Sequence, residues 1–321
     1  MKSHHHVALV GAGAWGKNLM RNLHELGALH SIVDRNPELQ ETAAELSVRY
    51  YPEISDVLVD DAVEAVVIAS PAEVHCEMAV SALDSGRHVF VEKPIALTEA
   101  DANRMAGAAA KNNRILMVGH LLQYHPAYRR LKELVQDGAV GKLQHIVSSR
   151  MNFGRIRSYE DVIWSFSPHD ISMVLGLIQS PVSDVSSRGV SLAQNGIADI
   201  GTLDLRFSNG VTAEIRASWL HPCKEQKLVV IGSSGMIVFD DRVPDERKLV
   251  LHRHTVVSHD GERRAVHGNC EPITFASGEP LRLEMEEFLR CVATGATPRT
   301  DANEALAVLK VLLQFEGAND A

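Results

Sequence analysis

Residues 7–16 read Val-Ala-Leu-Val-Gly-Ala-Gly-Ala-Trp-Gly, an apolar run that passes directly into the pattern G-x-G-x-x-G. A strand followed at once by this glycine spacing is typical of a loop that holds a dinucleotide pyrophosphate. Gly11 permits a tight turn, Gly13 lets the backbone approach the phosphates, and Gly16 allows close packing of helix and strand. The N-terminus of the following helix offers free N–H groups to the anion. We therefore expect residues 11–16, with Ala14 and Trp15 included, to bind the cofactor.

An acidic residue follows the second apolar run and bears on the choice of cofactor. The run Leu29–Val33 ends at Asp34, where a carboxylate is expected to meet the adenosine ribose hydroxyls. A carboxylate there repels a 2′-phosphate, so the sequence favours NAD over NADP. Arg35 leaves two alternatives open, because it could stack on the adenine or pair with a 2′-phosphate.

Composition and charge narrow the class of protein. The chain has 321 residues, enough for two domains, with 45% hydrophobic and 23% charged residues. Its net charge of −9 makes nucleic acids and anionic membranes poor partners. No apolar stretch approaches the ~18 residues of a membrane span, and the N-terminus lacks the apolar region of a signal peptide. These features predict a cytoplasmic protein.

Cysteine and histidine spacing gives no indication of a metal site. The four cysteines are scattered without a C-x-x-C pair, at Cys76, Cys223, Cys270 and Cys291. This spacing disfavours both a disulfide scaffold and a zinc site. The run His4-His5-His6 is not expected to bind metal in the function of the protein. We therefore expect no metal.

The first third of the chain alternates strand and helix signals. Three further apolar runs are expected to form buried parallel strands: Ala65–Ile68, His88–Val91 and Ile115–Val118. Two segments between them have helical patterns: Ala72–Ser85 and Thr98–Asn112, the second with Thr98 and Asp101 at the spacing of a capping box. Residues 1–120 are therefore predicted to form a doubly wound parallel sheet, the Rossmann arrangement.

Residues 121–321 are predicted to form a second, α+β domain for substrate binding and oligomerisation. After a helix over Pro126–Asp137, two strands flank the hairpin turn Ser208-Asn209-Gly210. Further strands are expected at Val229–Gly232 and Met236–Asp240, and two helices at Leu281–Thr294 and Asn303–Phe315. This pattern predicts a large, open, mainly antiparallel sheet with one face free for a substrate or a second subunit. We expect a homo-oligomer, a dimer or a tetramer.

Polar residues follow two of the predicted parallel strands. Glu92-Lys93-Pro94 comes after His88–Val91, at the carboxyl edge where a cofactor crosses such a sheet. Lys93 there could act beside the nicotinamide, with its pKa lowered by burial and by the cationic ring. Ser70 and Pro71 end the neighbouring strand and are expected to line the cofactor. His75 could join them or lie on a helix surface.

A second candidate for acid–base chemistry lies in the other domain. Pro168 is a helix-start signal, Ser167 could cap that helix, and His169 would then lie in its first turn. Sixteen histidines are present, so His169 alone would carry little weight.

Together these residues resemble the Gfo/Idh/MocA oxidoreductases. The glycine motif, Asp34, Glu92-Lys93-Pro94 and Pro168-His169-Asp170 occur in the order found in that family, over nearly the whole chain. The resemblance implies a Rossmann domain followed by an open-sheet domain. It also implies that Lys93 and His169 lie by the reacting carbon of a sugar or cyclitol.

One departure from the family pattern favours a particular substrate class. Many members have an aspartate four residues before the histidine, where this chain has Ser165. The segments 152–157 and 164–170 instead resemble the dehydrogenases that oxidise C3 of UDP-N-acetylglucosamine. Those enzymes supply a 3-keto sugar to an aminotransferase, which implies a PLP enzyme downstream and a 2,3-diamino sugar for lipid A or another surface glycan.

Cationic residues near His169 agree with a nucleotide-sugar substrate. Arginines suit bidentate contacts to phosphates, although each could also belong to a solvated loop. The predicted substrate contacts are Lys93, Tyr124, Arg150, Asn152, Arg155, Arg157, Trp164, His169 and Lys224. Tyr124 could equally be a packing residue.

The sequence leaves alternatives to this function. The substrate could be another nucleotide sugar, a free hexose or an inositol. The chain could also be a glycoside hydrolase that uses NAD transiently, or an NAD-binding regulator, although the presence of Lys93 and His169 argues against a regulator.

Overall fold

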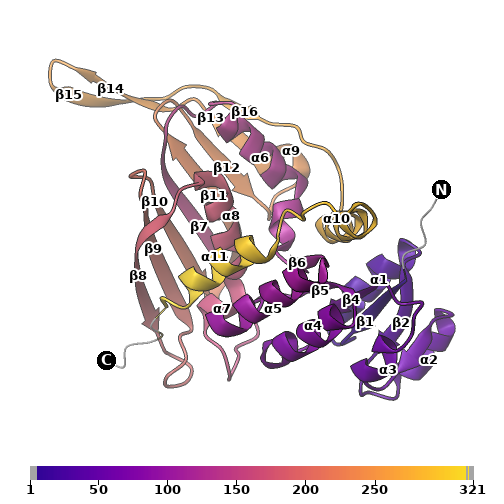
Figure 1. Ribbon diagram of the computed structural model, residues 1–321. Coiled ribbons are helices and arrows are strands. Elements are labelled where there is room, and N and C mark those ends of the chain that lie inside the picture. Colours follow the sequence, from indigo (N-terminus) through magenta and orange to yellow (C-terminus); the bar gives the residue numbers. More distant parts are fainter. Residues whose placement is uncertain (1–5, 316, 318–321) are drawn as a thin grey trace. The chain divides into compact units, whose positions relative to one another are not determined.

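The computed structural model describes residues 6–315 and 317 and divides them into two compact units (Figure 1). The first unit is built around a six-stranded parallel sheet in the order β3-β2-β1-β4-β5-β6. Its strands are β1 Val7–Val10, β2 Leu29–Val33, β3 Arg49–Tyr51, β4 Ala65–Ile68, β5 His88–Val91 and β6 Leu116–Val118. This confirms the predicted doubly wound sheet.

Helices connect the strands in the alternation predicted from sequence. They are α1 Gly16–Glu25, α2 Leu39–Glu45, α3 Ile54–Leu58, the 3₁₀ turn η1 Ala72–Val74, α4 His75–Asp84, α5 Glu99–Asn112 and the 3₁₀ turn η2 Leu121–Tyr124. The hydroxyl of Thr98 accepts a hydrogen bond from the Asp101 amide at 3.1 Å, as the capping pattern predicted. His4 and His5 lie outside the described residues.

The first unit also contains a segment from the far end of the chain, residues 279–309. This segment holds α10 Pro280–Thr294 and most of α11 Ala302–Leu312. Met285 and Phe288 are fully buried in the same core as Phe90, and the Phe90 and Phe288 rings meet edge to face with centroids 5.8 Å apart. The division at residue 120 therefore misplaced this segment, because its apolar face completes the core of the first unit.

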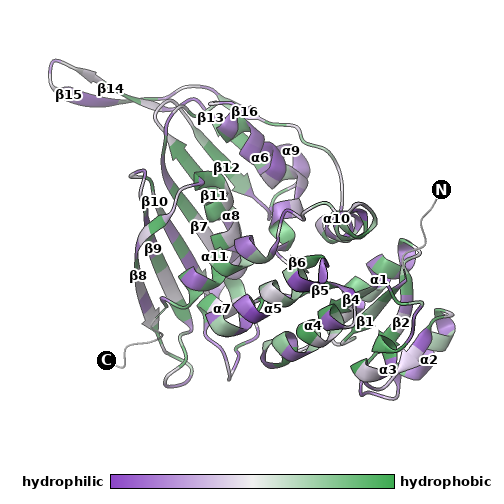
Figure 2. Ribbon diagram, in the orientation of Figure 1, coloured by the Kyte–Doolittle hydropathy of each residue, from purple (hydrophilic) through white to green (hydrophobic). Residues whose placement is uncertain are grey.

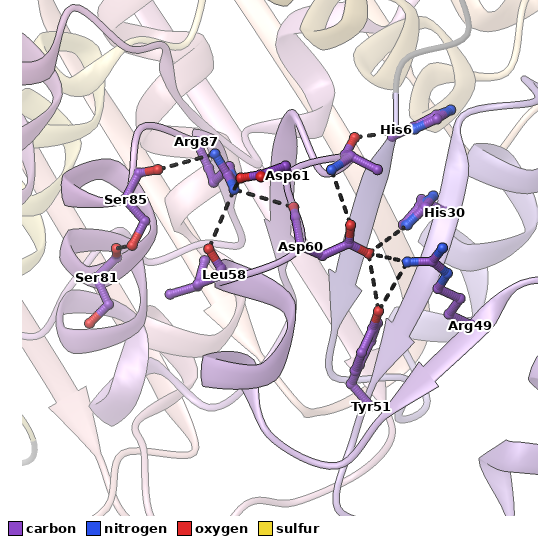
Figure 3. Close-up of polar contacts among 11 residues, drawn as sticks. His6, His30, Arg49, Tyr51, Leu58, Asp60, Asp61, Ser81, Ser85 and Arg87 are labelled. Carbon is purple, nitrogen blue, oxygen red and sulfur yellow. Dashed lines mark hydrogen bonds and ion pairs between the residues drawn. The ribbon is translucent and has the colours of Figure 1, made fainter.

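Asp60, in the segment before β4, contacts two strands of the first unit, β2 and β3, through its carboxylate (Figure 3). Its carboxylate accepts hydrogen bonds from Arg49 at 2.5 Å and from Tyr51 at 3.1 Å, and contacts His30 at 3.1 Å. The hydrogen bond with His30 contributes most to holding the pKa of Asp60 below its usual range. His30 and Arg49 lie at the amino ends of β2 and β3, opposite the edge where strands deliver functional groups, whereas Tyr51 is the last residue of β3.

The second unit is an eight-stranded sheet in the order β16-β13-β12-β11-β7-β10-β9-β8. Its strands are β7 Leu143–Phe153, β8 Val182–Val190, β9 Ile200–Phe207, β10 Thr212–Ser218, β11 Leu220–Gly232, β12 Met236–Asp240, β13 Leu249–His252 and β16 Cys270–Pro272. All pairs are antiparallel except β7 with β10. A separate hairpin consists of β14 Thr255–His259 and β15 Glu262–Val266.

Four helices pack against this sheet: α6 Pro126–Gln136, α7 Val162–Phe166, α8 Pro168–Ile178 and α9 Asp245–Lys248. Along β11, Leu228 and Val230 are fully buried, whereas the alternating Val229 and Ile231 are only half-buried. Figure 2 shows hydrophobic residues along the central strands and hydrophilic residues on α6. The large, mainly antiparallel sheet predicted from sequence is thus present. Among the described residues, no helix is long and apolar enough to cross a membrane.

Candidate functional site

The glycine loop after β1 has the backbone geometry that its sequence predicts. Gly11 has φ +88°, and a side chain there would lie 2.8 Å from the Ala69 carbonyl oxygen. A side chain at Gly16 would lie 2.0 Å from the carbonyl oxygen of Gly11, so only glycine lets α1 begin this close to the turn. A side chain at Gly13 would meet nothing within 4 Å, and Gly13 is exposed. The loop therefore presents open backbone in front of the N-terminus of α1.

Asp34 lies at the carboxyl end of β2, beside that loop. Its Oδ2 accepts a hydrogen bond from the Ala12 amide at 2.8 Å, and its Oδ1 accepts one from the Asn36 amide at 2.9 Å. These bonds fix the position of the carboxylate at the sheet edge. The neighbouring Arg35 is exposed and lies 3.3 Å from Glu53, so its nearest partner is another carboxylate.

Hydrogen bonds join the glycine loop to the segment that follows β5. Nε1 of Trp15 donates to Oε1 of Glu92, and the Lys93 amide donates to Oε2 of the same carboxylate at 3.2 Å. Burial raises the pKa of Glu92, an effect that the Trp15 and Lys93 contacts oppose. A side chain at Gly119 would lie 3.0 Å from Oε2, so this glycine leaves room for the carboxylate. Glu92 therefore acts as a link that positions Lys93.

His75 forms a second link at this edge. The ring is 1% exposed, with Nε2 2.9 Å from the Ser70 carbonyl oxygen and Nδ1 2.9 Å from the Pro94 carbonyl oxygen. The helix-surface alternative for His75 is therefore wrong. Burial lowers the pKa of His75. Because both ring nitrogens face protein carbonyls, His75 lies between the segments that follow β4 and β5. Ser70 is half-buried and Pro71 is exposed at the carboxyl edge of the sheet.

His169 lies in the first turn of α8, where it lines a pocket of the second unit with a volume of about 180 Å³. The lining residues are Arg150, Met151, Asn152, Ser165, Phe166, His169, Lys224 and Gln226. The pocket is smaller than the roughly 300–1,000 Å³ of sites that enclose a whole ligand. It fits one polar part of a substrate. Four predicted substrate residues thus meet here, while Trp164 is half-buried on α7 and is not among the lining residues.

Two of the three predicted phosphate-binding arginines are already paired with carboxylates. Nε of Arg150 lies 2.6 Å from Oδ2 of the buried Asp170, and Nη1 of Arg157 lies 2.7 Å from Glu160. Asp170 also accepts a hydrogen bond from the Ser148 hydroxyl at 2.6 Å. The carboxylates of Asp170 and Glu160 therefore offset the positive charge that the sequence predicts around Arg150 and Arg157. Arg155 and Lys224 are exposed, and Lys224 reaches the pocket.

The predicted roles of Tyr124 in substrate binding and of Ser167 in helix capping are both wrong. Tyr124 is 3% exposed, and its hydroxyl lies 3.0 Å from that of Thr300 within the core of the first unit, so packing is its role. The hydroxyl of Ser167 makes no capping bond to α8. Because α7 runs directly into α8, the Ser167 amide is bonded to the Ile163 carbonyl, and the backbone stays helical through this position.

The strand order, the glycine loop and Asp34 define a dinucleotide-binding oxidoreductase fold with a separate sheet domain. The described residues fit NAD, because the backbone at Gly13 is open to a pyrophosphate and the carboxylate of Asp34 lies where the ribose of a bound dinucleotide would be. Two family descriptions match this chain, "Oxidoreductase family, NAD-binding Rossmann fold" over residues 5–120 and "GFO/IDH/MocA C-terminal domain" over residues 128–238. The chain belongs to the Gfo/Idh/MocA oxidoreductase family and has an NAD-binding Rossmann domain. Its relatives include sugar and polyol dehydrogenases that act on CH–OH groups.

Relatives and solved structures similar to this chain cover between 73% and 99% of it. UDP-N-acetylglucosamine 3-dehydrogenase from Acidithiobacillus ferrooxidans is 27% identical, covering 99% of this chain and 98% of the relative. Its solved structure superposes with a TM-score of 0.82 at 26% identity, covering 96% and 95%. A putative oxidoreductase from Magnetospirillum magnetotacticum is 30% identical, with a TM-score of 0.85 and coverage of 98% and 100%. Myo-inositol 2-dehydrogenase from Thermotoga maritima is 28% identical, covering 73% and 75%.

Proposed function

We propose that this protein oxidises the C3 hydroxyl of UDP-N-acetylglucosamine to the 3-keto sugar, with NAD as the oxidant. The observation that carries the proposal is the full-length similarity to UDP-N-acetylglucosamine 3-dehydrogenase in both sequence and fold. The cationic Lys224 and the polar Asn152 beside His169 agree with a sugar that carries an anionic group. The 3-keto product would feed a PLP-dependent aminotransferase that makes a diamino sugar.

The chemistry requires a base as well as a hydride acceptor. Bound at the glycine loop and Asp34, NAD would supply the acceptor for the hydride that leaves the carbinol carbon. The hydroxyl proton must pass to a positioned side chain as the C=O bond forms. We assign this work to Lys93 and His169, with His169 as the base and Lys93 holding the oxygen; the reverse assignment is the alternative. Ser165 has no carboxylate and cannot serve as a third proton carrier.

One observation supports a second candidate, oxidation of an uncharged polyol. Because Asp170 neutralises Arg150, the pocket beside His169 is less cationic than its sequence suggests. An inositol would fit this arrangement, and an inositol dehydrogenase is among the relatives.

The two candidates are separated by incubation with NAD and a panel of UDP-sugars, free hexoses and inositols. NADH formation is measured directly, and the ketone is trapped with a PLP-dependent aminotransferase. Turnover confined to UDP-N-acetylglucosamine or its C6 acid supports the proposal. Turnover only with inositol replaces it by the polyol candidate, and glycoside cleavage without net NADH would indicate the hydrolase chemistry.

We also propose that the protein works in the cytoplasm as a homo-oligomer. The half-buried Val229 and Ile231 on the less covered side of β11 support self-association, because exposed apolar strands are normally covered. Sedimentation at micromolar concentration should show a species larger than the 35.1 kDa chain. A single species of that mass would overturn this part of the proposal.

A further inference from the structure

Imidazole and thiol groups gather at one end of the eight-stranded sheet, in residues that the proposed reaction does not use. His252, His254 and Cys270 each place one ligand atom within 4.8 Å of the others. His252 and His254 are half-buried and Cys270 is exposed, so an ion from solvent can reach them. We propose that these three residues bind a divalent transition-metal ion, with Zn²⁺ as the best chemical match.

The local structure explains why the three side chains meet. His252 ends β13 and stands opposite Cys270 in the antiparallel pairing with β16. Its Nδ1 lies 3.1 Å from the Cys270 sulfur. His254 comes two residues after the end of β13, and its ring centroid lies 5.3 Å from that of His252. The His-x-His pattern at the end of β13 therefore lies beside a cysteine on β16.

The segments around Arg253 and Gly268 run close together beside these ligands. The Arg253 amide donates to the Asn269 carbonyl at 2.9 Å, which continues the pairing beyond β13. A side chain at Gly268 would lie 2.2 Å from the Arg253 carbonyl oxygen, so glycine is required there. The Gly268 amide also donates to Nδ1 of His254 at 3.1 Å, and metal bound at that nitrogen would replace this bond. His267 packs edge-on against His254, with ring centroids 5.2 Å apart.

Ligand chemistry selects the ion. Two imidazoles and a thiolate suit Zn²⁺ and neighbouring transition metals, whereas Mg²⁺ and Ca²⁺ prefer oxygen ligands. Tetrahedral Zn²⁺ places its N and S ligands about 3.3–3.6 Å apart. Because the three ligand atoms lie within 4.8 Å of one another, side-chain rotations that move them by up to roughly 1–1.5 Å would complete this geometry. Binding releases the Cys270 proton to solvent and leaves both imidazoles neutral. The fourth position falls to water or to His267.

A metal ion at this site would hold together the two ends of the segment that contains the hairpin of β14 and β15. The ligands at 252–254 and at 270 flank the segment that contains β14 and β15. A metal ion joining them would close the base of this segment, whose strands carry the exposed side chains of Val256, Val257 and Val266. The expected effect is a stiffer hairpin, with no change in the chemistry at His169.

Cobalt titration of the full-length protein tests the site. The background is His4→Ala/His5→Ala, which leaves only His6 of the N-terminal histidine run and so prevents that run from chelating the ion. We expect one equivalent of Co²⁺ to give a thiolate charge-transfer band, which Zn²⁺ then removes by competition. Cys270→Ser should abolish this band. His252→Gln and His254→Gln should each weaken binding about 10- to 100-fold or more, the range known for loss of a partner around a metal site. Cys223→Ser, another exposed cysteine, is the matched control.

A second measurement is independent of the spectrum. Trypsin can cut at Arg263 or Arg264 in the exposed hairpin, and Zn²⁺ should slow this cleavage in the parent protein but not in Cys270→Ser. A charge-transfer band that survives Cys270→Ser, or that is lost equally in Cys223→Ser, overturns the proposal. So does Zn²⁺ protection that is the same in Cys270→Ser as in the parent.

Discussion

Nδ1 of His75 lies 2.9 Å from the carbonyl oxygen of Pro94, the residue that follows Lys93. Its other ring nitrogen contacts the Ser70 carbonyl at the same distance, so one buried imidazole joins the segments after β4 and β5. Burial lowers the pKa of His75, and the neutral ring can donate only one hydrogen bond at a time. We infer that His75 is a positioning residue for Lys93.

His75→Leu should lower kcat by about 10²-fold, the cost of a displacement of roughly 1 Å at a reacting group. KM for the sugar should change much less. His75→Gln, whose amide can still donate to one carbonyl, should recover part of kcat. His24→Leu, at an exposed position on α1, is the control. If both His75 variants lose thermal stability but keep wild-type kcat, the residue has only a structural role.

Replacing either proposed acid–base residue should remove turnover without removing cofactor binding. Lys93→Met and His169→Asn should each lose on the order of 10²–10⁴-fold in kcat, the contribution usual for positioned proton-transfer groups. NAD affinity, measured by calorimetry, should stay within a few-fold. Wild-type-like turnover in either variant, measured by coupled transamination of the 3-keto product, would refute the assignment.

Asp34→Ala should change the preference between cofactors. The substitution removes the carboxylate that accepts hydrogen bonds from the Ala12 and Asn36 amides. It also removes the negative charge that would repel a 2′-phosphate. NAD should bind more weakly, and the ratio of NADP to NAD affinity should rise. Titration of both cofactors against the variant and the unaltered protein measures this. Tighter binding of NADP than of NAD by the unaltered protein would reverse the assignment of Asp34.

Glu284→Gln should make the free energy of unfolding less dependent on pH. Glu284 is fully buried, and burial, with the nearby Glu92 and Glu304, raises its pKa well above the usual value. Above the unfolded pKa of about 4.3 the native state therefore binds more protons than the unfolded state. Stability falls as pH rises, by at most about 1.4 kcal/mol per pH unit until the native pKa is reached.

Denaturant unfolding between pH 5 and 9 should show this slope in the parent protein and a smaller one in Glu284→Gln. The variant should also be the more stable protein at the upper end of that range. Glu286→Gln, at an exposed position on the same helix, is the matched control and should keep the parent slope. Parallel pH profiles for the parent and Glu284→Gln would show that the carboxyl does not titrate as its burial implies.

The local pattern of the sequence was sufficient to predict the first sheet. β1, β2, β4 and β5 begin and end at the predicted residues, because buried parallel strands are short continuous apolar runs bounded by glycine or polar residues. The polar edge strand β8, with the sequence Val-Ser-Asp-Val-Ser-Ser-Arg-Gly-Val, was not predicted, since its residues lack a clear apolar alternation. Pairing with β9 stabilises it.

Contacts between distant segments account for what the sequence did not reveal. The partner of Arg150 is Asp170, and no local pattern indicates that a buried aspartate will neutralise this arginine. His252 and Cys270 meet because β13 pairs with β16, and a local pattern such as C-x-x-C does not indicate a contact of this kind. The glycine loop, in contrast, was predictable, because the positive φ of Gly11 and the close contact of Gly16 with the Gly11 carbonyl both arise within the loop itself.

The return of residues 279–309 to the first unit has a consequence for synthesis on the ribosome. The nucleotide-binding sheet is translated early, but Met285 and Phe288, which cover its core beside Phe90, are added some 160 residues after Tyr124. At about 5–20 residues per second this delay is roughly 10–30 s. Throughout that interval the nascent sheet has an uncovered apolar surface, which a chaperone could bind until the last helices emerge.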